Sequence, residues 1–359
     1  MIKKLIISLV VIAALFVSMF YGARAWLKSA LPERAYIEAL KQTTPSDLSY
    51  INENVPASRG RILTVLTNVN SMGEGEKIGY EHTELARAYW VFTANGFDVD
   101  FASPQGGKPP VVIDGDDMGA FDYAFLNATD IQDRIDESIP VSKINPLDYA
   151  AVYFVGGKGA MFDFPDNPDI QRIIKALYQH DRVISAVCHG PAALVNVTLD
   201  DGTMLLADKA VTGFTNEEEL FLIPDAITIF PFLLEDKLIQ QGALFDKGDR
   251  YLEQVTQHGK VITGQNPWSV WKMAEMVVAE LGYTPKQRTR TPEELAIDLL
   301  MTYERGGYNE AYSAMIAQPQ AYQRITILMH GIVSFMEFDI GKGIDLLRLT
   351  HHLKELAGE

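Results

Sequence analysis

The sequence contains a single cysteine, Cys188, among its 359 residues. One cysteine excludes an internal disulfide and any metal site built from several thiolates, so a role for this sulfur would be that of a lone thiol. Basic residues are also few: 31 Lys and Arg face 47 Asp and Glu, the formal net charge is −16, and no basic run is present. Because phosphate backbones are bound by clustered Lys and Arg, we do not expect nucleic acid as a partner.

Residues 1–28 differ from the acidic remainder. They carry basic but no acidic residues, and the run from Leu5 to Tyr21 is free of charge. This run falls in the range of a spanning helix, about 17–25 residues, and exceeds the core of a cleaved signal peptide, about 7–15. We therefore expect 1–28 to be an uncleaved N-terminal membrane anchor, with a cleaved signal as the alternative. The catalytic domain would then be extracytoplasmic, or periplasmic in a Gram-negative bacterium.

The middle of the chain alternates between strand-like and helix-like patterns. After a polar connector, residues 29–60, we predict strands at 62–69, 98–102, 150–155, 183–187, 211–213 and 261–263. Helices are predicted at 83–95, 168–179, 190–197 and 267–281. The alternation indicates an α/β domain over 61–284, with a doubly wound, mostly parallel sheet and helices on both faces. The Gly-, Pro- and Asp-rich stretch 103–119 is predicted to be a surface loop.

Residues 285–359 have helical periodicity only and are predicted to form a small all-α extension. Thr291 followed by Pro292 is a typical helix start, and breaks are expected near Gly306-Gly307, Gln318-Pro319 and Gly341. The apolar stretch Ile325–Phe338 fits core packing first, and a membrane or partner contact second.

Cys188 lies where a predicted strand meets a predicted helix, in the run Val-Ile-Ser-Ala-Val-Cys-His-Gly-Pro. This is the form of a nucleophile elbow, in which small neighbours permit a sharp turn and the side chain projects above the sheet. A helix N-terminus behind the sulfur would favour the thiolate. The opposing interpretation is an inert buried cysteine, which the adjacent His189 disfavours. One β-α unit earlier, Gly156-Gly157 follows a strand and can supply an oxyanion N–H, the other coming from His189.

Several motifs together resemble the ThiJ/PfpI superfamily, which has a class I glutamine amidotransferase-like fold. They are A-V-C-H-G-P at 186–191, T-G-F-T-N-E-E-E at 212–219, P-F-L-L-E at 231–235 and T-G-Q-N-P at 263–267. The similarity covers about 61–283 and is greatest to the larger branch of chaperone and glyoxalase III-like proteins. The N-terminal segment and the C-terminal extension do not belong to the common pattern.

The resemblance implies a catalytic set of Cys188 as nucleophile, His189 as base and Glu84 as the acid beside the sulfur. Glu219, or less well its neighbour Glu218, matches the acid that orients the histidine. Gly157 and His189 match the oxyanion donors.

One position departs from the family pattern. Lys158 stands at the expected pocket mouth, where the glyoxalase-like branch often has His, so the preferred substrate is in question. The resemblance implies no cofactor. We also predict no metal site, because the adjacent His351 and His352 would point about 100° apart on a helix.

Three functions are compatible with these residues. The first is a cysteine-dependent, cofactor-free lyase of the glyoxalase III (D-lactate dehydratase) type, which acts on a small carbonyl substrate such as methylglyoxal and gives D-lactate in a stress response. The second is a cysteine amidase or peptidase with the same nucleophile. The third is a membrane-tethered chaperone or redox-responsive module. A second copy of the chain, in a homodimer, is a further candidate partner.

Overall fold

A computed structural model describes residues 21, 22, 24, 34–73, 75–115, 118–319 and 322–356. The chain divides into two compact units. The first comprises the segments Met1–Ala39 and Arg290–Glu359, and the second is Leu40–Thr289. The boundaries predicted from the sequence, at 60/61 and 284/285, stay a prediction.

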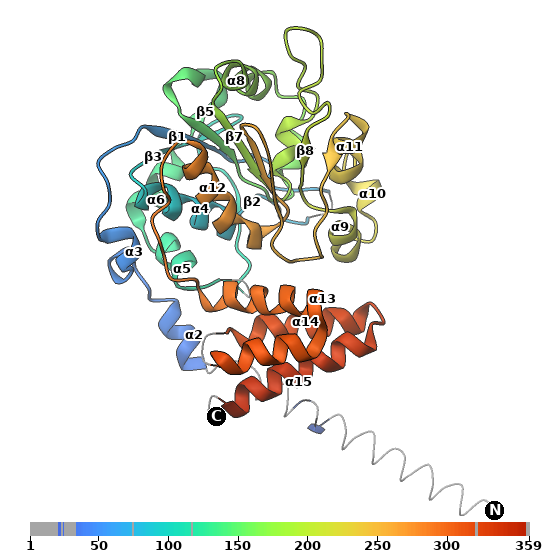
Figure 1. The fold of residues 1–359 in the computed structure, drawn as a ribbon. Coiled ribbons are helices and arrows are strands. Elements are labelled where there is room, and N and C mark those ends of the chain that lie inside the picture. The colour runs from blue at the N-terminus through green and yellow to red at the C-terminus, as the bar shows by residue number, and fades with distance from the viewer. Residues whose placement is uncertain are drawn as a thin grey trace, which may run out of the picture. The chain divides into compact units, whose positions relative to one another are not determined.

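A mixed sheet forms the centre of the Leu40–Thr289 unit (Figure 1). Its seven described strands have the order β10-β11-β7-β6-β1-β3-β5. All neighbours pair in parallel except the edge strand β10, which is antiparallel to β11. The predicted mostly parallel sheet is therefore confirmed. The strands are β1 (Arg61–Val65), β3 (Asp98–Ser103), β5 (Ile139–Pro140), β6 (Ala151–Phe154), β7 (Val183–Val187), β10 (Val255–His258) and β11 (Val261–Gly264).

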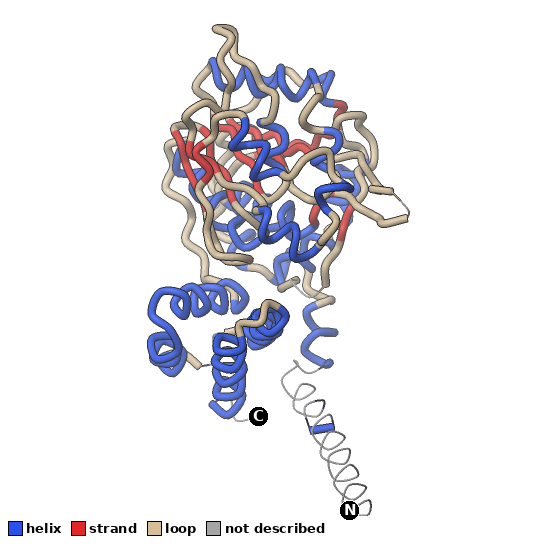
Figure 2. Tube along the Cα trace, turned by 90° about the vertical axis from the view of Figure 1, so that its right-hand side faces the viewer, coloured by secondary structure: helices blue, strands red, loops and turns tan. Residues whose placement is uncertain are grey.

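Helices cover both faces of this sheet, with α4 (His82–Ala94) and α12 (Val270–Glu280) packed together on one side and α8 (Pro168–Gln179) on the other (Figures 1 and 2). The central strands β6 and β7 are fully buried, as expected for parallel strands covered on both faces. The remaining helices of the unit are α3 (Ser49–Asn52), α5 (Ala120–Leu126), α6 (Thr129–Asp136), α7 (Ala160–Asp163), α9 (Asn216–Leu222), α10 (Ala226–Ile229) and α11 (Leu234–Gln240).

Shorter elements complete the unit. Two small sheets pair β2 (Tyr80–Glu81) with β4 (Val111–Val112), and β8 (Ala210–Val211) with β9 (Leu244–Phe245). The stretch 103–119, predicted as a loop, thus contributes the strand β4. The 3₁₀ helices are η1 (Pro45–Asp47), η2 (Val141–Lys143), η3 (Pro146–Asp148), η4 (Gly190–Leu194) and η5 (Pro267–Ser269).

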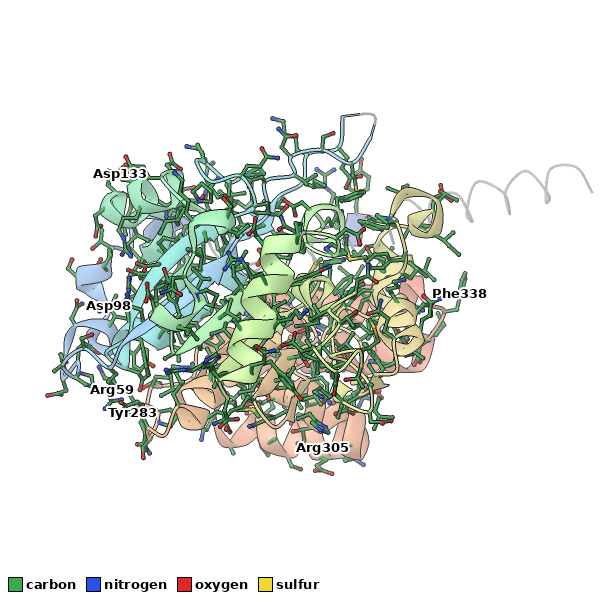
Figure 3. All side chains as sticks on the ribbon, turned by 90° about the horizontal axis from the view of Figure 1, so that it is seen from above. Arg59, Asp98, Asp133, Tyr283, Arg305 and Phe338 are labelled. Carbon is green, nitrogen blue, oxygen red and sulfur yellow. The ribbon has the colours of Figure 1, made fainter. Side chains whose placement is uncertain are left out.

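The ends of the helices follow local sequence signals. Asn167 caps α8, because its side chain accepts hydrogen bonds from the N–H groups of residues 169 and 170, and Pro168 occupies the first turn. Gly96 follows α4 with φ +83°, the left-handed conformation that favours glycine after a helix. At the end of the unit, the guanidinium of Arg59 lies 4.2 Å over the ring of Tyr283, so the entry to β1 and the exit from α12 are joined (Figure 3).

The C-terminal unit is helical, as predicted. It contains α2 (Arg34–Leu40), most of which lies in this unit, α13 (Pro292–Ala317), α14 (Arg324–Met336) and α15 (Ile340–Leu356). Thr291 caps α13 with Pro292 in the first turn, as expected, and Gly307 breaks its helical backbone with φ +72°. The stretch 325–338 is divided: Ile327 and Leu328 are buried, whereas Phe338 is exposed (Figure 3).

The prediction of a membrane anchor is corrected. Within the described residues the structure contains no helix that combines the length and the apolar character needed to cross a bilayer. The apolar run Leu5–Tyr21, on which the prediction rested, lies outside the described residues except for Tyr21. The anchor, and with it the extracytoplasmic location, is therefore not supported.

Candidate active site

Cys188 occupies a strained turn at the carboxyl end of β7. Its φ is +57°, a conformation that costs free energy for any residue with a Cβ, and it separates β7 from η4. A Cβ placed on Gly190 would lie 2.3 Å from the carbonyl oxygen of Phe154, so only glycine permits this turn to pack against β6. The helix predicted at 190–197 is the shorter 3₁₀ helix η4, in which Pro191 stands near the start.

The elbow is fixed by hydrogen bonds on both sides. The N–H of Cys188 donates to Gly264 in β11 over 2.9 Å, and its carbonyl accepts from the N–H of Phe214 over 2.8 Å. Both bonds hold the cysteine backbone between the sheet and the segment that leads to α9. A strained residue persists only where the surrounding structure determines it in this way.

His189 lies between the sulfur and a carboxylate. Its Nδ1 is 3.3 Å from Sγ of Cys188, and its Nε2 is 2.6 Å from Oε2 of Glu219, the fourth residue of α9. Because a carboxylate accepts the proton of Nε2, Nδ1 is left as the acceptor that faces the thiol. All three residues are buried. The geometry is that of a nucleophile, a base and the group that orients the base.

The pKa of the Cys188 thiol indicates that its deprotonation requires a base. Burial raises the pKa of Cys188 well above its ordinary value, and the charge of Glu84, when ionised, raises it further. The sequence analysis predicted a lowered pKa for this thiol, because a helix N-terminus was expected behind the sulfur. The helix η4 is only five residues long, and the effect of burial on the pKa outweighs that of the helix N-terminus. The resting sulfur is therefore a thiol, which must give up its proton to a neighbouring group.

Glu84 lies on α4 beside the sulfur, on the side of Gly156. A Cβ placed on Gly156 would lie 2.5 Å from Oε2 of Glu84 and 2.8 Å from Cβ of Cys188, so this glycine separates the two side chains. Burial, and next the charge of Glu81, raise the pKa of Glu84 well above its usual range. The Cys188 thiol and the Gly156 N–H oppose that rise without reversing it. Burial thus favours the neutral, protonated form of Glu84.

The two candidate glutamates on α9 have different surroundings. Glu219 contacts His189, whereas Glu218 is fully buried away from it and accepts five hydrogen bonds. The donors are the N–H and hydroxyl of Thr215, the N–H of Tyr251, and the side-chain amides of Gln265 and Asn266. Glu218 therefore ties α9 to the loop that precedes α12.

The other two predicted residues, Gly157 and Lys158, follow β6 in the chain and contact other segments. Gly157 has φ +97° and packs against β2, where a Cβ would lie 2.3 Å from the carbonyl oxygen of Gly79. Lys158 is partly exposed and pairs with Glu76 over 2.9 Å. Phe214 and Phe230 lie next to the imidazole of His189, at ring-centroid distances of 4.6 and 6.1 Å. The walls near the sulfur are therefore glycine backbone and aromatic rings.

In the part of the chain that the structure describes, no group of three or more His, Cys, Asp or Glu side chains is arranged to hold a metal ion. His351 and His352 each contact Glu355 at 3.3 and 3.2 Å, respectively.

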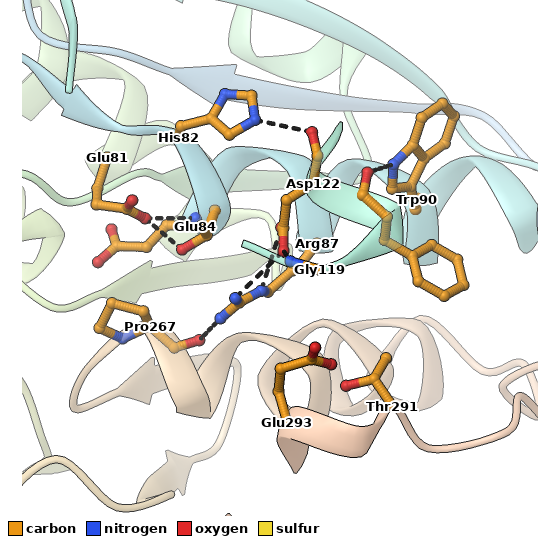
Figure 4. Close-up of polar contacts among 12 residues, drawn as sticks. Glu81, His82, Glu84, Arg87, Trp90, Gly119, Asp122, Pro267, Thr291 and Glu293 are labelled. Atoms are coloured by element: carbon orange, nitrogen blue, oxygen red, sulfur yellow. Dashed lines mark hydrogen bonds and ion pairs between the residues drawn. The ribbon is translucent and has the colours of Figure 1, made fainter. Parts of the chain in front are cut away.

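A buried charged network behind Glu84 was missed from the sequence. Arg87, one turn further along α4, pairs with Asp122 of α5 through Nε and Oδ1 at 3.3 Å and donates to the carbonyl of Pro267 at 3.1 Å (Figure 4). The sequence signal was an arginine three residues after Glu84 on a helix that is otherwise mostly apolar. Its partners are distant in the sequence, so no local pattern could identify them.

Comparisons with known proteins identify the family of the chain. The sequence model of the DJ-1/PfpI family matches residues 77–280. Glyoxalase 3 of Candida albicans is 30% identical over 234 residues, which cover 61% of this chain and 97% of that protein. The crystal structure of Candida albicans glyoxalase III is 27% identical with a TM-score of 0.59, covering 63% of this chain and 98% of that one. Rapid Encystment Protein 24 KDa of Francisella tularensis is 32% identical with a TM-score of 0.58, covering 62% and 99%.

Proposed function

The chain belongs to the DJ-1/PfpI family and is a glyoxalase III-like enzyme, and we propose that it converts a 2-oxoaldehyde such as methylglyoxal to a 2-hydroxy acid without glutathione. The observation that carries the proposal is the contact of Cys188 with His189, and of His189 with Glu219, at a strained strand-to-helix turn. The protonated Glu84 on the other side of the sulfur completes the set.

The reaction begins with the thiol. His189 takes the proton of Cys188 at Nδ1, and Glu219 stabilises the resulting imidazolium through Nε2. The thiolate adds to the aldehyde carbon of methylglyoxal and forms a hemithioacetal. In this step the N–H groups of Gly157 and His189 are the proposed donors to the oxyanion.

A proton then moves from the former aldehyde carbon to the neighbouring ketone carbon, carried by His189 or Glu84. The product is a thioester of a 2-hydroxy acid. Water hydrolyses this thioester and restores the thiol. The sum is methylglyoxal plus water to lactate: one carbon is oxidised while its neighbour is reduced, so no external oxidant or reductant is consumed.

Burial of the reacting groups favours a small substrate over an amide or peptide. Cys188 is 5% exposed and His189 3%, with aromatic rings beside the imidazole. A two- or three-carbon aldehyde can reach such a sulfur more readily than a peptide chain, which needs an open groove. The amidase or peptidase alternative shares the nucleophile but lacks this support.

The proposal is tested by incubating the purified protein with methylglyoxal and no glutathione, and measuring D- and L-lactate with stereospecific dehydrogenases. We expect lactate from the wild type and none from Cys188→Ala. The same amount of lactate from both proteins, or none from the wild type, would refute the proposal. Release of a peptide or amide product by the wild type, abolished in Cys188→Ala, would favour the hydrolase instead.

A further inference from the structure

Glu81 holds a fixed position beside the proposed acid. It ends β2 and caps α4, and its Oε2 accepts hydrogen bonds from the N–H of Glu84 over 2.8 Å and from the hydroxyl of Thr83 over 2.6 Å (Figure 4). Burial raises the pKa of Glu81, and these donors oppose that rise because they favour the ionised form of the carboxyl group. The position, at the N-terminus of a 13-residue helix, favours the same form.

Glu84 lies three residues further on and has weaker support, because the Cys188 thiol and the Gly156 N–H lie near its carboxyl group without ordinary hydrogen-bond geometry. Both of its carboxyl oxygens are buried, and neither has a hydrogen bond of ordinary geometry among the described residues. Two carboxyl groups within one helical turn, that of Glu84 fully buried and that of Glu81 partly buried, repel each other when both are charged, so the pair retains a proton. Because Glu81 has the donors, the charge belongs to Glu81 and the proton to Glu84.

The nearby cation does not remove this preference. Burial raises the pKa of both glutamates, and Arg87 opposes that rise without reversing it. Arg87 is also paired with the buried Asp122, so the two together are neutral. Two further groups face Glu84 from other elements. Tyr153 of β6 donates to the backbone carbonyl of Glu84 over 2.9 Å and stays neutral because burial raises its pKa, and the other group is the Cys188 thiol.

We propose that Glu81 is a positioning residue whose negative charge keeps the proton on Glu84, so that Glu84 faces the sulfur of Cys188 as a neutral hydrogen-bond donor. The inference rests on the proposed function only in giving that proton a use in catalysis.

The test uses the single cysteine of the chain, because the rate of alkylation by iodoacetamide then reports Cys188 alone. In Glu81→Gln the side-chain oxygen still accepts from the helix N–H but carries no charge. Glu84 then ionises at lower pH, and its charge disfavours the thiolate beside it. We expect the alkylation rate at neutral pH to fall by about tenfold for each unit by which the pKa of the thiol rises.

Two further variants separate this effect from a structural one. Glu81→Asp retains the charge and a good capping group, and its alkylation profile should stay close to that of the wild type. In a Glu84→Gln background no proton can be lost from position 84, so Glu81→Gln should change nothing more.

An unaltered alkylation profile in Glu81→Gln would overturn the inference, as would an equal change in the Glu84→Gln background. Alkylation requires no turnover. A failure of lactate formation would therefore refute the proposed function without affecting this result.

Discussion

Replacing Glu219 by Gln is the most direct test of the base. The carboxylate oxygen lies 2.6 Å from Nε2 of His189, and both side chains are 4% exposed, so solvent does not replace the lost charge. Gln retains a carbonyl oxygen that can accept the same hydrogen bond. The substitution therefore removes the charge and leaves the shape almost unchanged.

The magnitude follows from the charge of the imidazolium. A hydrogen bond to a charged group contributes about 1.5–3 kcal/mol, against about 1 kcal/mol for a neutral one. Because Gln still accepts a neutral hydrogen bond, the loss is the difference, about 0.5–2 kcal/mol. Since about 1.4 kcal/mol corresponds to tenfold, this lowers the population of the thiolate–imidazolium pair by roughly 2- to 30-fold. We expect a decrease of this order in kcat/KM for lactate formation, with little change in the free energy of unfolding.

The matched control is Glu218→Gln, one residue earlier on α9. Two of the five donors around Glu218 bond to one carboxylate oxygen and three to the other, so two or three of them would then meet an NH₂ group that cannot accept, and each unpaired buried group costs about 1–3 kcal/mol. We expect a loss of stability in urea unfolding and a smaller effect on kcat/KM per folded molecule. If Glu218→Gln abolished lactate formation in a folded protein while Glu219→Gln retained it, the assignment of Glu219 would be wrong.

Three further predictions concern other parts of the chain. Gly156→Ala places a Cβ 2.5 Å from Oε2 of Glu84, so kcat/KM should fall by about 100-fold, and unaltered turnover would contradict the placement of Glu84. Burial raises the pKa of Asp163 to about 6 from 3.8, so its contribution to stability is present at low pH and is lost as pH rises through the folded value, by about 3 kcal/mol in total. Urea unfolding between about pH 4 and 7 should show this decline in the wild type but not in Asp163→Asn. In α15, Gly343→Ala meets the ring of Phe335 at 2.9 Å and should destabilise the helical unit by about 1–3 kcal/mol, whereas Gly341→Ala, 3.7 Å from its nearest neighbour, should stabilise it by up to about 1 kcal/mol in thermal unfolding.

The parts of the fold with continuous apolar runs could be predicted from the sequence. The predicted strands 62–69, 150–155 and 183–187 correspond to the adjacent parallel strands β1, β6 and β7, because strands buried on both faces are rich in apolar residues. The first of them ends at Val65, earlier than predicted. The start of α13 could also be predicted from the local sequence, because the capping residue Thr291 and the first turn, which begins with Pro292, lie within four residues of each other. Signals of this kind do not depend on distant partners.

Other features depended on contacts that no local pattern records. The strand β10 was missed because Val-Thr-Gln-His is short, polar and half exposed, and it is a strand only through its pairing with β11. The predicted helix after Cys188 was too long, because the tight turn and Pro191 produce a 3₁₀ helix instead. Glu81 was not identified from the sequence for the same reason, because the role that we propose for it depends on the burial of Glu84, three residues further along the chain.

The sequence motifs that lie far from the sulfur have a common structural role. Gln265 and Asn266, from the T-G-Q-N-P motif, donate to Glu218, and Glu235, from P-F-L-L-E, accepts from the N–H of Asn216 at the start of α9. All of these bonds hold the first turn of the helix that carries Glu219. A base is effective only when its partner is held within a few tenths of an ångström, and a seven-residue helix cannot provide that precision by itself. Three residues of these motifs, Gln265, Asn266 and Glu235, therefore contact the first turn of α9, and through it they help to fix the position of the Glu219 carboxylate.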